Sequence, residues 1–335
     1  MATEAAVGCV LAHSLKLPDL VFKKGRRLQP ADLLRLRDSG ITEVVVAQLE
    51  GGDVPEDEAA TQMAECLGGA LVDVAPASNG RANLFAREAG LARIDATRIL
   101  AVNSVHESLT VATLPDFEPV RAGQMLATVK IIPYAAPRVA LDRIAEVASG
   151  ADRPVAVAAF CNLGVGLIST RLPGTRDAAL AKMRLAVVNR LVPLHARLLD
   201  ERVVPHAPQP LAEALGSLTR RPEIDVVLIF GIAATVDRAD IVPTAIALAR
   251  GRVERAGMPV DPGNLLVLGS VERQEGRCTV VGIPTCARSP KLNGFDFVLR
   301  RLAAGLAVSA GDIVGLGVGG LLSEIPSRPM PRDAQ

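Results

Sequence analysis

The segment from residue 225 to residue 299 limits the fold most strongly, because apolar runs in it end repeatedly in loops of small residues. The pattern predicts, in order, a strand over 225–230, a loop over 231–240, a helix over 241–249, strands over 265–268 and 279–282, and a helix over 295–303. Buried strands that alternate with helices are typical of an open α/β sheet. We therefore predict an α/β fold for this part of the chain.

The loop over 231–240 carries acidic residues next to a predicted helix start. Backbone N–H groups and the positive end of the helix dipole would favour an anion there. Asp237 and Asp240 could hold a divalent cation that bridges to this anion. The alternative is an ordinary strand-to-helix turn capped by Asp240, and the sequence leaves both interpretations open.

Two further loops follow the same pattern. Residues 258–264 contain a Pro-Gly turn just before a strand, and residues 282–294 lie between a strand and a helix. Because the loops at the carboxyl ends of parallel strands meet at one edge of a sheet, we expect these three loops to converge. Open α/β sheets commonly bind ligands at that edge.

This order of loops resembles the molybdopterin-binding domain of molybdenum-cofactor biosynthesis proteins, which include molybdopterin molybdotransferases and adenylyltransferases. The matching features are the Gly-small loop ending in Asp-x-x-Pro, the Pro-Gly turn before a strand and the Gly-x-Pro turn before a helix. Residues 166–170 resemble the strand that opens that domain, and the resemblance covers residues 154–325. It implies a C-terminal three-layer α/β/α domain with a mostly parallel sheet, whose loops bind the pterin and its terminal phosphate.

The resemblance also implies which residues bind the cofactor. They are Thr170, Gly231, Ala233, Ala234, Asp240, Gly263, Asn264, Pro284, Cys286, Arg288, Ser289 and Lys291. In this interpretation Arg288 and helix N–H groups bind the phosphate, and Thr170 and Asn264 lie at polar edges of the pterin. Asp237 and Asp240 are the candidates for holding Mg²⁺.

Several positions depart from the family pattern. Ile232 replaces the second Gly of the loop, Asn264 replaces the Lys after Pro-Gly, and residues 171–173 replace a Gly-Asp-Glu sequence. Losing an acidic pair and a Lys weakens the case for catalysis. Arg288 and Lys291 return positive charge to the loop, so phosphate binding stays in the prediction.

The sequence leaves three functions open. The first is a protein that binds molybdopterin or the molybdenum cofactor during biosynthesis, delivery or insertion into a molybdoenzyme. The second is a Mg²⁺-dependent molybdopterin transferase, which inserts molybdate or moves a nucleotide, with Asp237 and Asp240 on the metal and Lys291 neutralising developing charge. The third is a regulatory module that binds another phosphorylated metabolite.

Composition excludes several other classes. Lys and Arg number 37 against 36 Asp and Glu, so no bulk charge attracts nucleic acid or anionic lipid. Aromatic residues make up only 2%, which argues against base-stacking surfaces. No apolar run has the length of a membrane span, and we expect a cytoplasmic protein. The resemblance implies a homo-oligomer, with a pterin ligand and a molybdoenzyme or another biosynthesis protein as partners.

The five cysteines are widely spaced, with no Cys-x-x-Cys pair, which argues against a disulfide framework and a zinc site. Cys286 differs because it lies in a candidate loop near Arg288, where a cation can lower a thiol pKa. Cys286 therefore has either a redox or sulfur-contacting role or simple packing as its interpretation. The four histidines show no metal-ligand spacing and are expected at surface or polar core positions.

The rest of the chain divides by pattern into a small α/β unit over 1–70 and a β-rich domain over 71–150, before the molybdopterin-binding domain over 151–330. The first contains a helix over 30–38 and a strand over 42–47, and the second contains strands over 108–113 and 124–132. Residues 148–154 are the expected linker before the last domain.

Three motifs in these parts have two interpretations each. The basic turn over 22–27 is either a phosphate contact or a solvated hairpin tip, and the acidic run over 50–58 is either a metal site or a helix start. The tract Cys-Ala-Arg-Ser-Pro-Lys-x-Asn-Gly-Phe-Asp over 286–296 resembles a subgroup of molybdopterin-binding proteins. The turn over 79–83 and Lys130 resemble the same subgroup, and a role in closing over a ligand is the alternative to an edge lysine.

Overall fold

The computed structural model describes residues 1–274 and 276–322. The chain divides into two compact units, Met1–Ala158 and Ala159–Gln335, and each is described by itself. Within the described ranges, no helix combines the length and the apolarity that crossing a bilayer requires.

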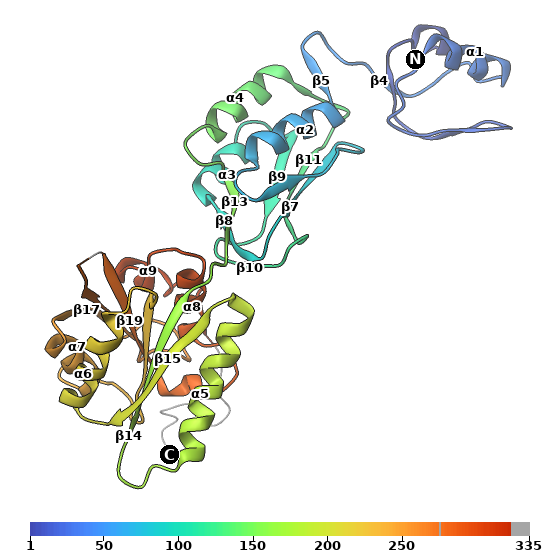
Figure 1. Ribbon diagram of the computed structural model, residues 1–335. Coiled ribbons are helices and arrows are strands. Elements are labelled where there is room, and N and C mark those ends of the chain that lie inside the picture. The colour runs from blue at the N-terminus through green and yellow to red at the C-terminus, as the bar shows by residue number, and fades with distance from the viewer. Residues whose placement is uncertain (275, 323–335) are drawn as a thin grey trace, which may run out of the picture. The chain divides into compact units, whose positions relative to one another are not determined.

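The second unit is built on a six-stranded sheet in the order β15-β14-β16-β19-β18-β17 (Figure 1). Its strands are β15 (Arg197–Pro205), β14 (Gly164–Arg171), β16 (Val226–Phe230), β19 (Arg277–Ile283), β18 (Val267–Glu272) and β17 (Gly251–Ala256). The first four run parallel, and β18 and β17 are antiparallel to their neighbours. The expected α/β class with a mostly parallel sheet is confirmed.

Helices cover both faces of this sheet. One face carries α5 (Asp177–Leu191), α8 (Gly294–Ala303) and α9 (Ala310–Gly315), and the other carries α6 (Pro208–Thr219) and α7 (Ile241–Leu248). The helices α6 and α7 pack side by side (Figure 1). The unit therefore has the three layers α/β/α.

Strand β16 shows why these residues form the centre of the sheet. All five of its side chains are at most 2% exposed. Val226, Leu228 and Phe230 pack under α5 and α8, while Val227 and Ile229 pack under α6 and α7. Successive side chains of a strand point to opposite faces, so an uninterrupted apolar run is what a strand covered on both faces requires.

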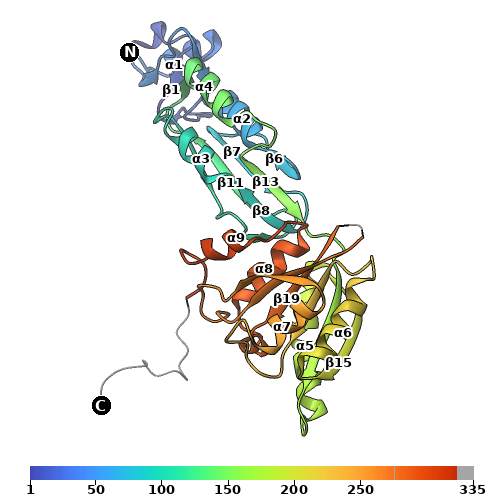
Figure 2. The ribbon, with the colours of Figure 1, turned by 90° about the vertical axis from the view of Figure 1, so that its left-hand side faces the viewer.

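The first unit contains an antiparallel sheet in the order β6-β7-β11-β9, from β6 (Val72–Val74), β7 (Arg81–Ala86), β11 (Met125–Ile131) and β9 (Leu109–Thr113). The helices α2 (Glu56–Leu67) and α4 (Arg138–Ala148) pack on each other, and α2 packs on β7 and β11 (Figure 2). The remaining elements are α3 (Ala96–Asn103), the strands β10 (Pro119–Val120), β8 (Gly90–Ile94) and β13 (Val155–Ala159), and the pair β12 (Ala135–Pro137) and β5 (Asp53–Pro55).

A separate small core holds the first residues of the chain. It is formed by η1 (Thr3–Ala5), α1 (Pro30–Asp38) and the short strands β1 (Val10–Leu11), β2 (Leu15–Lys16), β3 (Val21–Phe22) and β4 (Val46–Ala47). The helix expected over 30–38 is found there, but the strand expected over 42–47 is only two residues long. The strand expected over 265–268 is found later in the chain, as β18 over Val267–Glu272.

The boundaries drawn from the sequence differ from the packing in one respect. The main core of the first unit joins residues from Val54 to Val157, and so it runs across residue 70. The reason is that α2 turns its apolar face, which includes Met63 and Leu67, onto strands that follow it in the chain. The division into three domains stays a prediction, and residues 323–330 of the last one lie outside the described residues.

Candidate functional site

The loops named from the sequence follow strands that end at one edge of the sheet. In the parallel register, Ser169 of β14 pairs with Phe230 of β16, and Phe230 pairs with Ile283 of β19. Gly231 and Pro284, the residues after β16 and β19, therefore leave the sheet at neighbouring points, next to Thr170 near the end of β14. Two of the predicted loops, over 231–240 and 282–294, thus start side by side next to the end of β14.

Thr170 joins three of these chain segments. It is fully buried, and its Oγ1 accepts the N–H of Ile232 at 2.9 Å. The same oxygen lies 2.8 Å from Nδ1 of His206, which follows β15. A side chain on Gly231 would come within 2.9 Å of the Ala233 carbonyl, so the loop closes tightly after β16. Thr170 consequently fixes the start of this loop and has its hydroxyl already engaged.

His206 is a neutral partner in this contact at physiological pH. Its partial burial lowers the pKa of the imidazole below the ordinary value, and attraction to Asp240 offsets this only in part. His206 is half-buried, which agrees with the surface or polar core position expected for the histidines, but its contact with Thr170 was not predicted. Its position directly after a strand end was the signal that could have identified it.

The two acidic residues of the loop hold the loop itself. Asp240 Oδ2 accepts the N–H groups of Val236 and Asp237 at 2.6 and 2.9 Å, and Asp237 Oδ1 accepts the N–H of Ala239 at 2.7 Å. The first two bonds lower the pKa of the Asp240 carboxyl. Asp240 occupies the N-cap position of α7, but its side chain makes no capping bond to that helix. The interpretation that the Asp240 side chain caps α7 is therefore wrong. The carboxylate stabilises the preceding loop instead.

The carboxylates of Asp237 and Asp240 fit a magnesium ion only in part. Mg²⁺ is commonly bound by one or two carboxylates together with water and substrate phosphates, so two acids are sufficient in number. One oxygen of each carboxylate is, however, already engaged with backbone N–H groups. Within residues 1–274 and 276–322 there is no group of three or more His, Cys, Asp or Glu residues suited to a metal. The magnesium site stays a prediction.

Arg288 connects the loop after β19 with the loop after β16. It lies in η3 (Thr285–Arg288), and its Nη2 donates to the carbonyl of Ile232 at 2.7 Å. The guanidinium carbon lies 6.0 Å from the ring centroid of Phe230. Its Nε is buried and has no hydrogen-bond partner among the described residues. A buried, unsatisfied N–H of a cation is costly, so this position favours an additional acceptor.

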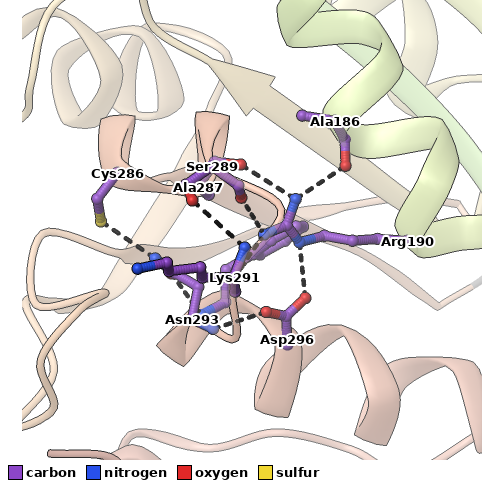
Figure 3. A network of polar contacts seen from close by, with 9 residues as sticks. Ala186, Arg190, Cys286, Ala287, Ser289, Lys291, Asn293 and Asp296 are labelled. Carbon is purple, nitrogen blue, oxygen red and sulfur yellow. Dashed lines mark hydrogen bonds and ion pairs between the residues drawn. The ribbon is translucent and has the colours of Figure 1, made fainter. Parts of the chain in front are cut away.

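Arg190 holds the loop that carries Arg288 (Figure 3). This arginine comes from α5, and its Nε forms an ion pair of 2.7 Å with Asp296, both side chains being only about a tenth exposed. Its other nitrogens donate to carbonyls of the loop at Ala287, Ser289 and Lys291, at 3.0, 2.9 and 3.2 Å. One side chain thus sets the course of the loop from η3 to α8.

The Pro-Gly turn is fastened to the same loop at the start of α8. A side chain on Gly263, whose φ is +128°, would come within 2.5 Å of the Gly294 nitrogen. Asn293 donates from Nδ2 to the sulfur of Cys286 at 3.1 Å, and its N–H donates to Asp296 at 2.7 Å (Figure 3). Asn293 and Asp296 form a capping box, so the N-terminus of α8 is satisfied by its own residues.

The other predicted residues differ in exposure. Pro284 is buried, Cys286 and Ser289 are half-buried, and Ala233, Ala234, Asn264 and Lys291 are exposed. Contacts join Thr170, Gly231, Cys286, Arg288 and Gly263 through neighbouring loops at one edge. Arg190 and Asp296 could not be predicted from the sequence, because a buried ion pair between two helices leaves no local pattern. The spacing of Asn293 and Asp296 was the one usable signal.

Comparison with known proteins gives one family model over a short part of the chain and several structural similarities at low TM-scores. A family model described as a domain of unknown function (DUF8806) matches residues 1–48. A search of the curated proteins found no match. Among solved structures, a molybdenum cofactor biosynthesis protein B is similar at 11% identity and a TM-score of 0.31, covering 44% of this chain and 96% of that one.

Two further solved structures are similar to the chain. The tungsten cofactor synthesizing protein MoaB from Pyrococcus furiosus has 16% identity and a TM-score of 0.27, with 42% of this chain and 91% of that one covered. The molybdopterin biosynthesis enzyme MoaB from Thermus thermophilus has 14% identity and a TM-score of 0.27, with 43% and 97% covered. At such TM-scores the similarity does not transfer a site to this chain.

Proposed function

We propose that the C-terminal unit binds molybdopterin or the molybdenum cofactor at the carboxyl edge of β14, β16 and β19. The protein would then take part in biosynthesis of the cofactor, its delivery, or its insertion into a molybdoenzyme. The observation that carries this proposal is the position of Arg288. It joins two of the loops that resemble the pterin-binding loops, and its buried Nε has no partner among the described residues.

The electrostatics of the loops support an anionic ligand. Arg288 and the exposed Lys291 bring two cations to the loop between β19 and α8, and a phosphate can accept from both. The N-terminus of α7 adds the positive end of a helix dipole, which Asp240 does not cap. Tethering of the loop by Arg190 keeps these donors in place before the ligand arrives, which lowers the cost of binding.

The residues present support binding more than transfer. The acidic pair expected after Thr170 is replaced by residues 171–173, and the carboxylates of Asp237 and Asp240 hold their own loop. A Mg²⁺ ion held by these two aspartates would neutralise phosphate charge when the ligand is bound. No general acid or base lies among the contacts of Arg288 in the described part of the chain, so we assign the chain a carrier role.

The test measures binding of the pterin to the purified full chain by the fluorescence of its oxidised derivative. Arg288→Met should weaken binding by roughly tenfold to a hundredfold, since a hydrogen bond to a charged group is worth about 1.5–3 kcal/mol. Arg252→Met is the matched control, because Arg252 is exposed on β17 and contacts none of these loops. Equal loss in both variants would contradict the assignment.

A second arm separates a carrier from an enzyme. The full chain is incubated with pterin, molybdate and magnesium-ATP, and the pterin products are analysed. A carrier gives binding without product. Product formation that Asp240→Ala abolishes would replace our proposal with a magnesium-dependent transferase.

A further inference from the structure

A second hollow lies at the opposite edge of the same sheet. It has a volume of about 720 Å³ and is formed by the end of α6, the residues after α7, and the turn that follows β18. Glu272 at the end of β18 pairs with Arg277, where the parallel strand β19 begins. The hollow is therefore at the amino edge of the parallel strands, away from the loops that contain Thr170 and Arg288.

Three arginines line this cavity. Arg220 follows α6, Arg250 follows α7, and Arg273 lies in the turn after β18. Within the part of the chain that the structure describes, the exposed side chains of Arg220 and Arg250 form no hydrogen bond or ion pair. Glu272 is the only acidic residue among the described lining residues, and it forms no ion pair with an arginine in the described part of the chain. Two cationic groups are thus available to a ligand.

Arg273 has a different role at the base of the cavity. Its guanidinium donates to the carbonyl of Ile224, and its backbone N–H donates to Gly276 at 2.9 Å. Its Nε is buried without a partner in the described chain. Arg273 therefore fastens the turn to the segment before β16 and adds positive charge beneath the two free arginines.

The helix ends moderate this charge. The C-termini of α6 and α7 both point to the cavity, and each carries about −0.5 of an elementary charge. Against the three guanidinium groups and the one carboxylate of the described lining residues, these ends leave a net positive charge of about one. The carbonyls of Leu218 and Ala247 near these ends already accept the N–H groups of Arg221 and Arg250, but each carbonyl oxygen has a second lone pair that can accept from a hydroxyl group. The site consequently offers anion binding and hydroxyl acceptance together.

The lining also indicates the kind of skeleton that the ligand has. Pro222 and Val271 present aliphatic surface, and no aromatic residue occurs among the described residues of the cavity. A nucleobase would lack a stacking partner there, whereas a sugar ring needs none. The volume is within the range of small-molecule sites, which is about 300–1,000 Å³.

We propose that this cavity binds a phosphorylated sugar, with Arg220 and Arg250 on the phosphate and the carbonyl ends of α6 and α7 on the hydroxyl groups. This site is separate from the pterin edge and independent of the function proposed above. Ligand there would contact α6 and α7, whose other ends lie next to His206 and Asp240.

The experiment is isothermal titration of the full chain with glucose 6-phosphate, inorganic phosphate and glucose as probes. We expect saturable binding of glucose 6-phosphate, at least tenfold weaker binding of inorganic phosphate, and no binding of glucose. Arg220→Met with Arg250→Met should weaken glucose 6-phosphate binding by roughly a hundredfold, since each charged hydrogen bond contributes about tenfold or more. Both side chains are exposed and unpaired within the described residues, so the double variant should melt like the parent protein.

Two control variants make the result specific. Arg197→Met removes an exposed arginine of β15 outside the cavity, and Arg288→Met removes the cation of the pterin edge. Both should bind glucose 6-phosphate as the parent does. The proposal is overturned if glucose 6-phosphate does not bind, if inorganic phosphate binds equally well, or if the double variant binds like the parent.

Discussion

Replacing Arg190 by methionine tests how the candidate loop is held. The methionine keeps an unbranched side chain of similar length on α5 and removes the guanidinium. Asp296 then remains in a buried position without its ion-pair partner, and the carbonyls of Ala287, Ser289 and Lys291 lose their donor. Both members of the pair are only about a tenth exposed, so water cannot replace the lost contacts fully.

The expected cost follows from this burial. Removing one partner of a buried ion pair costs about 3–5 kcal/mol, because the remaining charge stays desolvated. For a unit of this size, each kcal/mol lowers the melting temperature by about 2–4 °C, so Arg190→Met should lower it by roughly 10 °C. The bond from Asn293 to Asp296 persists, and α8 should therefore still begin at the same residue.

Scanning calorimetry of the full chain measures this change, and a double-mutant cycle assigns it to the pair. Asp296→Asn keeps an acceptor for the N–H of Asn293 but removes the charge. The loss of unfolding free energy in the double variant Arg190→Met/Asp296→Asn should be smaller than the sum of the two single-variant losses by at least about 1 kcal/mol. The reason is that neither charge is left unpaired in the double variant. A single-variant loss below about 1 kcal/mol, or strict additivity, would refute the argument that this pair organises the loop.

Three further changes test other contacts. Gly263→Ala should lower the free energy of unfolding by about 2–4 kcal/mol in urea, because its Cβ would come within 2.5 Å of the Gly294 nitrogen. Gly305→Ala, at a position with φ +69° and open space, should cost only about 1 kcal/mol. Equal losses in the two variants would contradict the close approach at Gly263. His206→Gln should flatten the pH dependence of stability: the pKa of His206 is lowered on folding, so the parent loses stability as pH falls below about 6.5 and the variant should not. Glu56→Gln should stabilise the first unit at neutral pH. Burial raises the pKa of the Glu56 carboxyl, so the parent protein loses stability as pH rises above about 4.5. A melting temperature of the variant equal to that of the parent from pH 4.5 to 7 would contradict this expectation.

The fold of the C-terminal unit could be predicted from sequence because its signal is local. The run Val226–Phe230 is apolar at every position, and the small residues after it mark the loop. Burial on both faces of a parallel sheet produces this pattern directly. The short strands of the first fifty residues carry no comparable periodicity, and β4 was consequently predicted too long.

The candidate site could be predicted only as a set of loops. Their convergence follows from parallel strand order, which the alternation of strands and helices indicates. Which groups hold the loops depends on contacts between distant residues. Thr170 with Ile232 and Arg190 with Asp296 are separated by 62 and 106 positions, and no single-sequence pattern encodes such pairs.

Asp240 shows the same limit at shorter range. An acidic residue directly before a helix predicts an N-cap, and the position is correct. The side chain instead turns back to the N–H groups of Val236 and Asp237, because two donors of the preceding loop are within its reach. Local propensity identified the place but not the partner.

Hydrogen–deuterium exchange of the full chain with and without the pterin tests the central claim most directly. If the ligand binds at the carboxyl edge of β14, β16 and β19, amides in residues 231–241 and 284–293 should exchange more slowly when it is present. The turn after β18, at the opposite edge, should be unaffected. Protection confined to other segments, or no protection at saturating pterin, would contradict the account.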